Sequence, residues 1–244
     1  MESMKTYREF LKAHLWEIWE SLETDQRKKI PSPPIQKPYP QEAELIDLVA
    51  PEDFTVGNMP LIEAINRRRS RRKFTEESLT LEEFSFLLWT TQGVHEVKGV
   101  VGMRTVPSAG ARHPFETYLL VRQVTGLQPG LYRYLPLEHK VYLLTPDAGL
   151  LDKADVAWYT KNCAVVFVWT AIPYRTEWRY GIISPKLIAL DAGHVCQNLY
   201  LACEAIGAGT CAIGAYSQDG MDAILGIDGE EEFTVYVAPV GNLE

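Results

Sequence analysis

The sequence lacks the features that mark a disulfide scaffold, a membrane protein or a nucleic-acid binder. Its 244 residues include 4 cysteines, and none of them forms a C-x-x-C pair. No apolar run reaches the roughly 18–20 residues of a membrane span, and the first residues lack the apolar segment of a signal peptide. The formal net charge is −8, whereas nucleic-acid binding requires an excess of Lys and Arg on one face. These absences predict a cytoplasmic protein with neither membrane nor nucleic acid as a partner.

Common catalytic and cofactor motifs are also missing. There is no G-x-x-x-x-G-K-[ST], H-E-x-x-H or G-x-S-x-G, which excludes phosphate-loop, zincin and hydrolase interpretations. The cysteines are Cys163, Cys196, Cys203 and Cys211, each among apolar or small neighbours. They are either buried reduced thiols or, alternatively, a metal site or catalytic thiol.

The first 55 residues differ in pattern from the rest. Apolar residues at helical spacing predict a helix over residues 5–29, and five prolines between residues 30 and 40 predict an extended arm. The arm crosses either its own domain or a partner, and Trp16 and Trp19, which need cover, favour a dimer contact. We therefore divide the chain into an N-terminal helix and proline-rich arm (1–55) and a main domain (56–244).

Helices and short strands intermix in the main domain. A capping box at Thr80 and Glu83 begins a helix that ends near Gly93, and a longer helix is predicted over residues 185–206. Strands are predicted at residues 115–123, 130–134, 140–144, 163–170, 210–215 and 233–240, with a loop at 94–106. The absence of regular βαβ alternation predicts an α+β fold.

Three segments of the main domain could carry chemistry. Residues 67–73 hold six Arg or Lys in seven positions, which suits an anionic ligand or else a solvated helix end paired with nearby glutamates. Small residues between Pro107 and Pro114 form either a stiff loop that a flat ligand can approach or a turn with a structural histidine. The glycines around residues 207–216 follow a helix rather than open one, so they either expose backbone N–H groups to a ligand or simply stop the helix.

Taken in order, these segments resemble the flavin-dependent nitroreductase superfamily, and within it the SagB-type thiazole/oxazole-forming dehydrogenase branch. Each motif alone is weak, but their order and joint presence are specific, and the resemblance covers roughly residues 30–241. The segments that carry it are residues 68–74, 81–89, 92–93, 104–114, 130–134, 191–194, 197–202 and 214–216.

The resemblance implies a nitroreductase-like fold, with a central, mostly antiparallel sheet flanked by helices, and a homodimer with FMN sites at the subunit interface. The implied FMN contacts from one subunit are Arg68, Arg69, Ser70, Arg72, Ile213, Gly214 and Ala215. Those implied from the other subunit are Pro107, Ser108, Ala109, Gly110 and Ala111. Because the flavin N5 carries the chemistry, no metal and no catalytic side chain are expected, and His113 and His194 take structural roles.

Two departures from the family pattern matter. Many members have a basic residue near the C-terminus that touches the phosphate, but this chain ends in Leu243 and Glu244; Arg71, Arg104 or Arg112 could replace it. Azoline-oxidising relatives use an adjacent Lys-Tyr pair before the long helix, whereas here Lys186 precedes a leucine and the nearest tyrosine is Tyr180.

The resemblance thus implies an FMN-dependent oxidoreductase. NADH or NADPH would pass hydride through the flavin to an unidentified small-molecule or peptide acceptor, or the flavin would oxidise a substrate directly. The alternative is a flavin-binding subunit of a peptide-modifying complex that has no turnover of its own.

Overall fold

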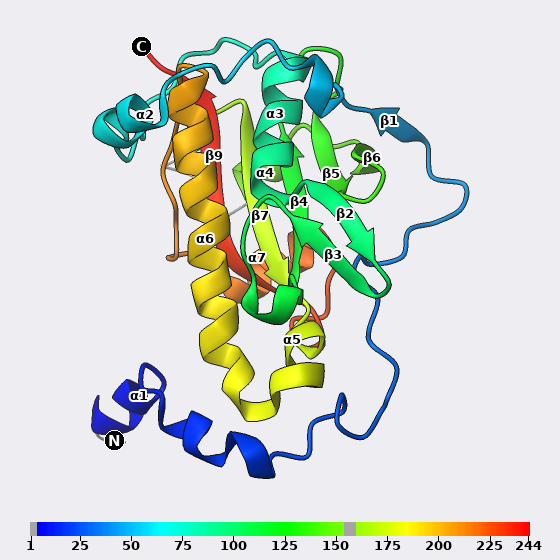
Figure 1. Cartoon of the computed structure of the whole chain (residues 1–244). Coiled ribbons are helices and arrows are strands. Elements are labelled where there is room, and N and C mark those ends of the chain that lie inside the picture. Colours follow the sequence, from blue (N-terminus) through cyan, green and yellow to red (C-terminus); the bar gives the residue numbers. More distant parts are fainter. Residues whose placement is uncertain (1–3, 154–159) are drawn as a thin grey trace.

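The protein is built around a seven-stranded antiparallel sheet (Figure 1). The computed structural model describes residues 4–153 and 160–244. Among these the strand order is β1-β6-β5-β4-β7-β9-β8, and a separate hairpin joins β2 and β3. The strands are β1 (Leu45–Asp47), β2 (Val94–Lys98), β3 (Val101–Arg104), β4 (Phe115–Val121), β5 (Gly130–Leu135), β6 (Lys140–Thr145), β7 (Val165–Ala171), β8 (Ala208–Thr210) and β9 (Phe233–Asn242). The predicted α+β class and antiparallel sheet are confirmed.

Helices cover both faces of this sheet. The long helix α6 and helix α3 lie on one face, and α7 lies on the other (Figure 1). The α-helices are α1 (Met4–Glu9), α2 (Leu61–Arg67), α3 (Leu81–Gln92), α4 (Leu150–Lys153), α5 (Tyr174–Tyr180), α6 (Ser184–Ala205) and α7 (Gln218–Leu225). Short 3-10 helices are η1 (His14–Ser21), η2 (Pro51–Asp53), η3 (Ala109–Ala111) and η4 (Gly181–Ile183).

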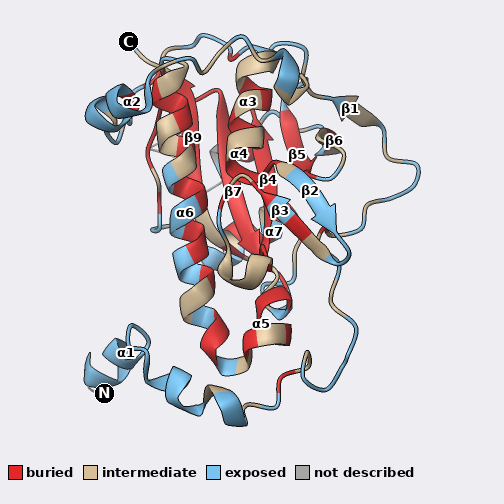
Figure 2. Ribbon diagram, in the orientation of Figure 1, coloured by how far each residue is buried: buried red, intermediate tan, exposed pale blue. Residues whose placement is uncertain are grey.

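The sheet separates two apolar cores. Strand β7 is buried along its whole length, as its unbroken apolar run predicts, and β4 and β5 are buried too (Figure 2). Because successive side chains of a strand point to opposite faces, Phe167 packs with Leu199 of α6, whereas Val166 packs with Met221 of α7. Both faces of the central strands are therefore buried, and the outer side of α6 remains exposed.

The two helices on the α6 side begin and end where the sequence predicts. The Thr80 hydroxyl accepts the Glu83 N–H at 3.1 Å and the Glu83 carboxylate accepts the Thr80 N–H at 2.8 Å, which completes the capping box. Helix α6 has Pro185 in its first turn, where the missing N–H costs nothing. It stops just before Gly207, whose φ of +78° suits glycine.

Two predictions about extended segments were wrong. Residues 94–106 contain the β2–β3 hairpin rather than only a loop, with Gly99 at φ +60° in its turn. The strand predicted at 210–215 is shorter and earlier, because β8 ends at Thr210 and only Ile213 bridges to β9 afterwards. The cause is Ala212, whose N–H donates to the Tyr200 hydroxyl instead of to a strand.

The continuous N-terminal helix was also wrong. Helix α1 ends at Glu9, and the 3-10 helix η1 has no buried residue, so nothing packs along one face to stabilise a long helix. The Arg27 guanidinium donates to three carbonyls just after Ile18, which fixes a turn there. Trp16 and Trp19 lie 6.0 Å and 5.5 Å from Tyr180 of the same chain, measured between ring centroids. Part of their cover therefore comes from their own domain.

The proline-rich arm is extended, as predicted, and lies across its own domain. Side chains of the main domain donate to its carbonyls: Trp178 to Ile30 and Arg104 to Ile35, and Arg133 to residues 37 and 38. The arm is also bound through its own side chains: Gln36 donates to Glu138, and Lys37 forms an ion pair with Glu232. It leads into β1, which pairs with β6 at the edge of the sheet.

Candidate functional site

The arginine-rich segment and the 211–216 segment meet on the side chain of Tyr200, in α6. The Tyr200 hydroxyl hydrogen-bonds the Ser70 hydroxyl at 3.1 Å and accepts the Ala212 N–H at 2.8 Å. The Arg68 guanidinium lies 5.4 Å from the centroid of the Tyr200 ring, within cation–π range. Two of the three segments singled out in the sequence are thus brought together within one chain.

Backbone bonds fix the arginine segment in place. The Arg69 N–H donates to the buried Glu204 carboxylate at 3.2 Å, and the Arg71 N–H donates to the Thr210 carbonyl at 2.8 Å. The side chains of Arg69, Ser70 and Arg72 remain exposed, while Arg68 and Arg71 are half-buried. The backbone is therefore held against β8 and α6, and the cationic side chains face outward.

A pocket of about 600 Å³ lies beside this segment. Its lining residues are Arg67, Ser70, Arg71, Arg72, Lys73, Gly207, Leu243 and Glu244. The Arg71 Nε is buried and makes no hydrogen bond, and it lies 3.9 Å from the Glu204 carboxylate. A buried guanidinium nitrogen without a hydrogen-bond acceptor, in a pocket with four cationic side chains, fits an anionic group such as a phosphate.

Of the three arginines expected as replacements for the missing C-terminal cation, Arg71 lines this pocket. The two other candidates lie elsewhere: Arg104 donates to Gln92 and Ile35, and Arg112 donates to Ser32. The C-terminal residue lining the pocket is acidic, Glu244, so the site is less positive than its arginine count suggests.

The 211–216 segment contains one residue bonded to the sheet, Ile213, followed by two exposed residues, Gly214 and Ala215. The side chain of Ile213 is buried, and its backbone exchanges hydrogen bonds with Val237 in both directions. Gly214 and Ala215 are exposed, and their N–H groups donate to no other residue in the described part of the chain. Backbone donors for a ligand are therefore available from Gly214 and Ala215, whereas Ile213 anchors them to the sheet.

The third predicted segment, residues 107–114, is held by α6 at a different place. The Ser108 hydroxyl donates to the Asp191 carboxylate at 2.6 Å, and the Ala109 N–H donates to the same group at 3.2 Å. The Ser108 hydroxyl also accepts the His113 N–H at 2.9 Å. Gly110, Ala111 and His113 have φ values of +58°, +51° and +44°, so the loop is a tightly wound turn that these bonds over-determine.

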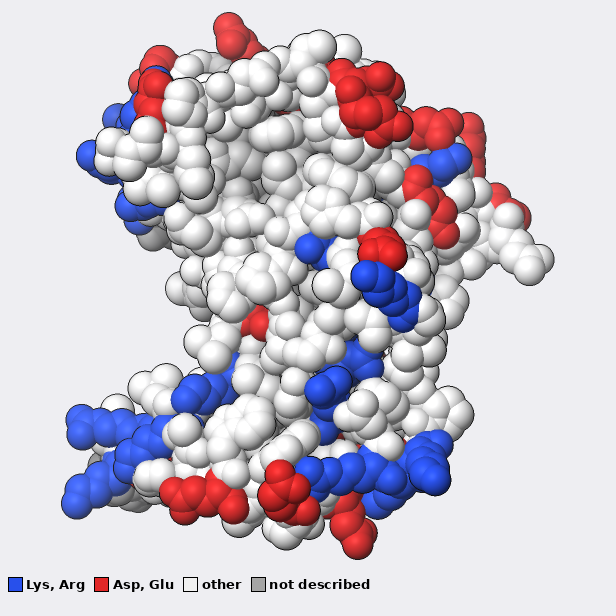
Figure 3. Space-filling view, viewed as in Figure 1, with Lys and Arg blue, Asp and Glu red and all other residues white. Residues whose placement is uncertain are grey.

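One chain does not bring this loop to the arginine segment. Asp191 and Tyr200 are nine residues apart on α6, which is about 14 Å along the axis and about half a turn around it. They flank opposite sides of the exposed face of α6, on which lie Leu190, His194 and Gln197. Figure 3 shows a hollowed, largely uncharged surface over α6 between two groups of basic residues. In one chain the two segments therefore lie on different flanks of α6.

Burial keeps His113, Cys163 and Cys196 in their neutral forms near pH 7. Burial and the charges of Arg104 and Arg112 lower the pKa of His113 to about 3, so it is neutral near pH 7. All four cysteines are buried free thiols, and burial raises the pKa of Cys163 and Cys196 to about 12. In residues 4–153 and 160–244 no cluster of three His, Cys, Asp or Glu could hold a metal ion.

Sequence reasoning assigned no role to Asp191, Tyr200 and Glu204, which organise the site from α6. Their polar side chains occur on a helix that is otherwise apolar on its inner side, which was the available signal. Nothing in the sequence indicates which loop each contacts. Lys186 and Tyr180, which do not form the adjacent Lys-Tyr pair of azoline-oxidising relatives, bind the N-terminal segment: the Lys186 ammonium donates to the Leu11 carbonyl and Tyr180 packs on Trp19.

No helix in the described part of the chain is long and apolar enough to cross a bilayer. A family model described as "Nitroreductase family" matches residues 65–242. The "Putative nitroreductase MJ1384" of Methanocaldococcus jannaschii is 33% identical over 189 residues, which are 76% of this chain and 92% of that protein.

Two further proteins are similar over different lengths. The "Trifolitoxin-processing protein TfxB" of Rhizobium leguminosarum is 26% identical over 133 residues, which are 51% of this chain but 36% of that protein. A crystal structure of a "putative nitroreductase" from Ralstonia eutropha aligns with a TM-score of 0.68 at 24% identity, covering 88% of this chain and 99% of that chain. At that identity the likeness shows the fold alone.

Proposed function

The chain belongs to the nitroreductase family, and we propose that it is an FMN-dependent oxidoreductase of the SagB-type branch. The observation that carries this proposal is the basic pocket beside Ser70, to which the buried Arg71 Nε contributes an unused donor. The exposed N–H groups of Gly214 and Ala215 lie in a segment that Tyr200 ties to the same place. Together they provide cations for a phosphate and backbone donors for a flat ring.

When bound, FMN supplies hydride transfer at its N5. Arg68, Ser70 and Arg72 hold the phosphate and ribityl chain, with Arg69 and Arg71 adding positive charge, and residues 213–215 line the ring. The chain's own contribution is to bind and orient the flavin and to stabilise negative charge on it with cations and N–H donors. The electron donor is NADH or NADPH, and the acceptor is a small molecule or a peptide.

Each site is completed by a second copy of the chain. Residues 107–111, which Asp191 holds on the opposite flank of α6, contact the flavin bound at the arginine segment of the partner. The uncharged exposed face of α6 between the two flanks is the surface on which the copies meet.

Absorption spectra and rapid mixing test the enzyme. The purified protein, titrated with FMN, is expected to become yellow and to bind one FMN per chain. Mixing the loaded protein anaerobically with NADH or NADPH is expected to bleach the flavin band, and an acceptor restores it. A protein that stays colourless after addition of FMN refutes the proposal.

Subunit mixing tests the two-chain site. Arg72→Ala damages the arginine segment, and Ser108→Ala loosens the loop that Asp191 holds. If each site takes one part from each copy, a purified heterodimer of the two variants has one intact site and one doubly damaged site. It therefore binds half the wild-type FMN, although each variant alone binds weakly. A heterodimer that binds no better than the variants refutes the shared site.

A flavin-binding subunit without turnover is the second candidate. Two observations favour it: one relative is named for trifolitoxin processing, and Lys186 and Tyr180 are occupied by the N-terminal segment. The rapid-mixing experiment separates the two functions, because such a subunit binds FMN but is not reduced by NADH or NADPH at a useful rate.

A further inference from the structure

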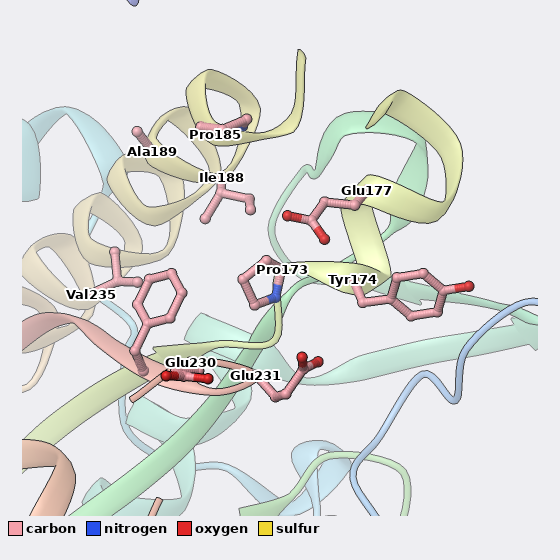
Figure 4. A pocket seen from close by; sticks show the side chains of 10 residues that line it. Pro173, Tyr174, Glu177, Pro185, Ile188, Ala189, Glu230, Glu231 and Val235 are labelled. Atoms are coloured by element: carbon pink, nitrogen blue, oxygen red, sulfur yellow. The ribbon is translucent and has the colours of Figure 1, made fainter. Parts of the chain in front are cut away.

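A second pocket, of about 470 Å³, opens between α5, the first turns of α6 and the start of β9 (Figure 4). Its apolar walls include Ile188 from α6 and Phe233 and Val235 from β9. The remaining lining residues are Pro173, Tyr174, Glu177, Pro185, Ala189, Glu230 and Glu231. The pocket shares no residue with the basic pocket beside Ser70.

Three carboxylates surround this apolar interior. Glu177 comes from α5, and Glu230 and Glu231 come from the turn before β9; Figure 4 shows them on opposite sides of the opening. Within residues 4–153 and 160–244, none of the three makes an ion pair or accepts a hydrogen bond. Partial burial and the charge of Glu231 raise the pKa of Glu177, so these two carboxylates lie close enough to interact.

The turn that carries two of these carboxylates is built rigidly. The Asp228 carboxylate accepts the N–H groups of Glu230 and Glu232 at 2.9 Å and 3.0 Å, and Gly229 takes a φ of +75°. The next residue, Glu232, is buried and accepts the Thr170 hydroxyl at 2.6 Å. The backbone that carries Glu230 and Glu231 is therefore set in advance, and a ligand has only their exposed side chains to order.

The pocket adjoins the loop that is proposed to contact the partner's flavin. Ile188 lies one helical turn before Asp191, which holds the 107–111 loop. A substrate with one part in this pocket extends from there toward the flavin that this loop contacts.

We propose that this pocket selects the substrate by binding a basic side chain of a peptide, with its aliphatic stem on Ile188 and Val235 and its ammonium or guanidinium group among Glu177, Glu230 and Glu231. The charge and shape of the pocket fit such a group, because apolar walls accept the stem and unpaired carboxylates neutralise the head. The dinucleotide pyrophosphate of NADH carries the wrong charge and is repelled. That the bound peptide is oxidised or reduced rests on the proposed flavin function; the binding itself does not.

Calorimetric titration with small probes tests the pocket. Hexylguanidinium carries both the stem and the cation, while 1-hexanol and hexanoate carry the stem without a positive charge. Wild type is expected to bind hexylguanidinium more tightly than 1-hexanol, with affinity that falls as salt is added, and not to bind hexanoate. The double variant Glu177→Gln/Glu231→Gln is expected to bind hexylguanidinium more weakly than wild type, by up to about fivefold for each carboxylate removed.

Glu76→Gln is the matched control. It removes an exposed carboxylate near the other end of β9, where the Thr75 N–H donates to Asn242, and it is expected to bind hexylguanidinium like wild type. Equal affinity of wild type for 1-hexanol and hexylguanidinium, or no change in Glu177→Gln/Glu231→Gln, overturns the inference. A protein that binds FMN but not the cation refutes the pocket alone, whereas one that binds the cation but never FMN refutes the proposed function alone.

Discussion

Replacing Tyr200 with phenylalanine should loosen the proposed flavin site without disturbing the fold around it. The hydroxyl joins the Ser70 side chain to the Ala212 N–H, and Tyr200→Phe removes only that oxygen. The aromatic ring and its contact with Arg68 remain. The variant therefore isolates the hydrogen bonds that hold the arginine segment and the 211–216 segment together.

The loss of stability depends on how exposed Ser70 and Ala212, the two hydrogen-bond partners of the Tyr200 hydroxyl, are. Ser70 is exposed, so water replaces its lost bond at little cost. The half-buried Ala212 N–H loses its acceptor, which costs about 1–2 kcal/mol. For 244 residues the unfolding entropy is about 0.5 kcal/mol/K, so this loss lowers the Tm by about 2–4 °C. If the same bond orders the site for FMN, the Kd rises about 5- to 30-fold.

Calorimetric melting and FMN fluorescence titration measure both effects. Tyr132→Phe is the control, because its hydroxyl also hydrogen-bonds a backbone group: on β5, it donates to the Gln128 carbonyl at 2.8 Å. It is expected to lower the Tm by a similar amount and to leave the Kd for FMN unchanged. The reasoning is refuted if Tyr200→Phe binds FMN as tightly as wild type, or if Tyr132→Phe loses FMN equally.

Three further outcomes are expected. Arg72→Ala weakens FMN binding by about 1.5–3 kcal/mol, the range for a charged hydrogen bond, and an unchanged titration removes Arg72 from the site. Glu116→Gln leaves the buried Arg175 and Arg133 guanidinium groups without their carboxylate, which costs about 3–5 kcal/mol; a Tm within 1–2 °C of wild type in a thermal melt, roughly the shift of a surface change, contradicts this. The pKa of His113 is lowered to about 3 in the fold, so only the unfolded chain takes up its proton below about pH 6.5. Its contribution to stability is therefore complete above pH 6.5 and falls between pH 6.5 and pH 3, and urea titrations of His113→Asn should show a shallower loss than wild type over that range.

The local patterns in the sequence were sufficient for most of the main domain. The capping box at Thr80, the proline in the first turn of α6 and the apolar run of β7 each act through neighbouring residues or simple burial, so they predict the same structure in any context. The family motifs added the order of these elements, which fixed the fold. Local patterns gave the wrong structure where a residue distant in the sequence determines the backbone conformation. At Ala212, for example, the N–H donates to the Tyr200 hydroxyl instead of to a strand.

In the N-terminal segment, by contrast, the local pattern predicted the wrong structure. Its apolar spacing is helical, but η1 has no buried residue, and a helix of that length needs a surface to pack on. What the segment meets instead is Tyr180 and the Lys186 ammonium. These contacts join residues more than 150 positions apart, and no periodicity in the sequence records them.

The sequence by itself determined the residue types of the proposed flavin site, which are a run of cations and two loops of small residues. The tertiary structure decided how they combine. Helix α6 carries Tyr200 on one flank and Asp191 on the other, and these hold two of the loops about half a turn apart. The physical reason is that one rigid helix separates its two flanks, so a single chain keeps these two loops on different sides of α6.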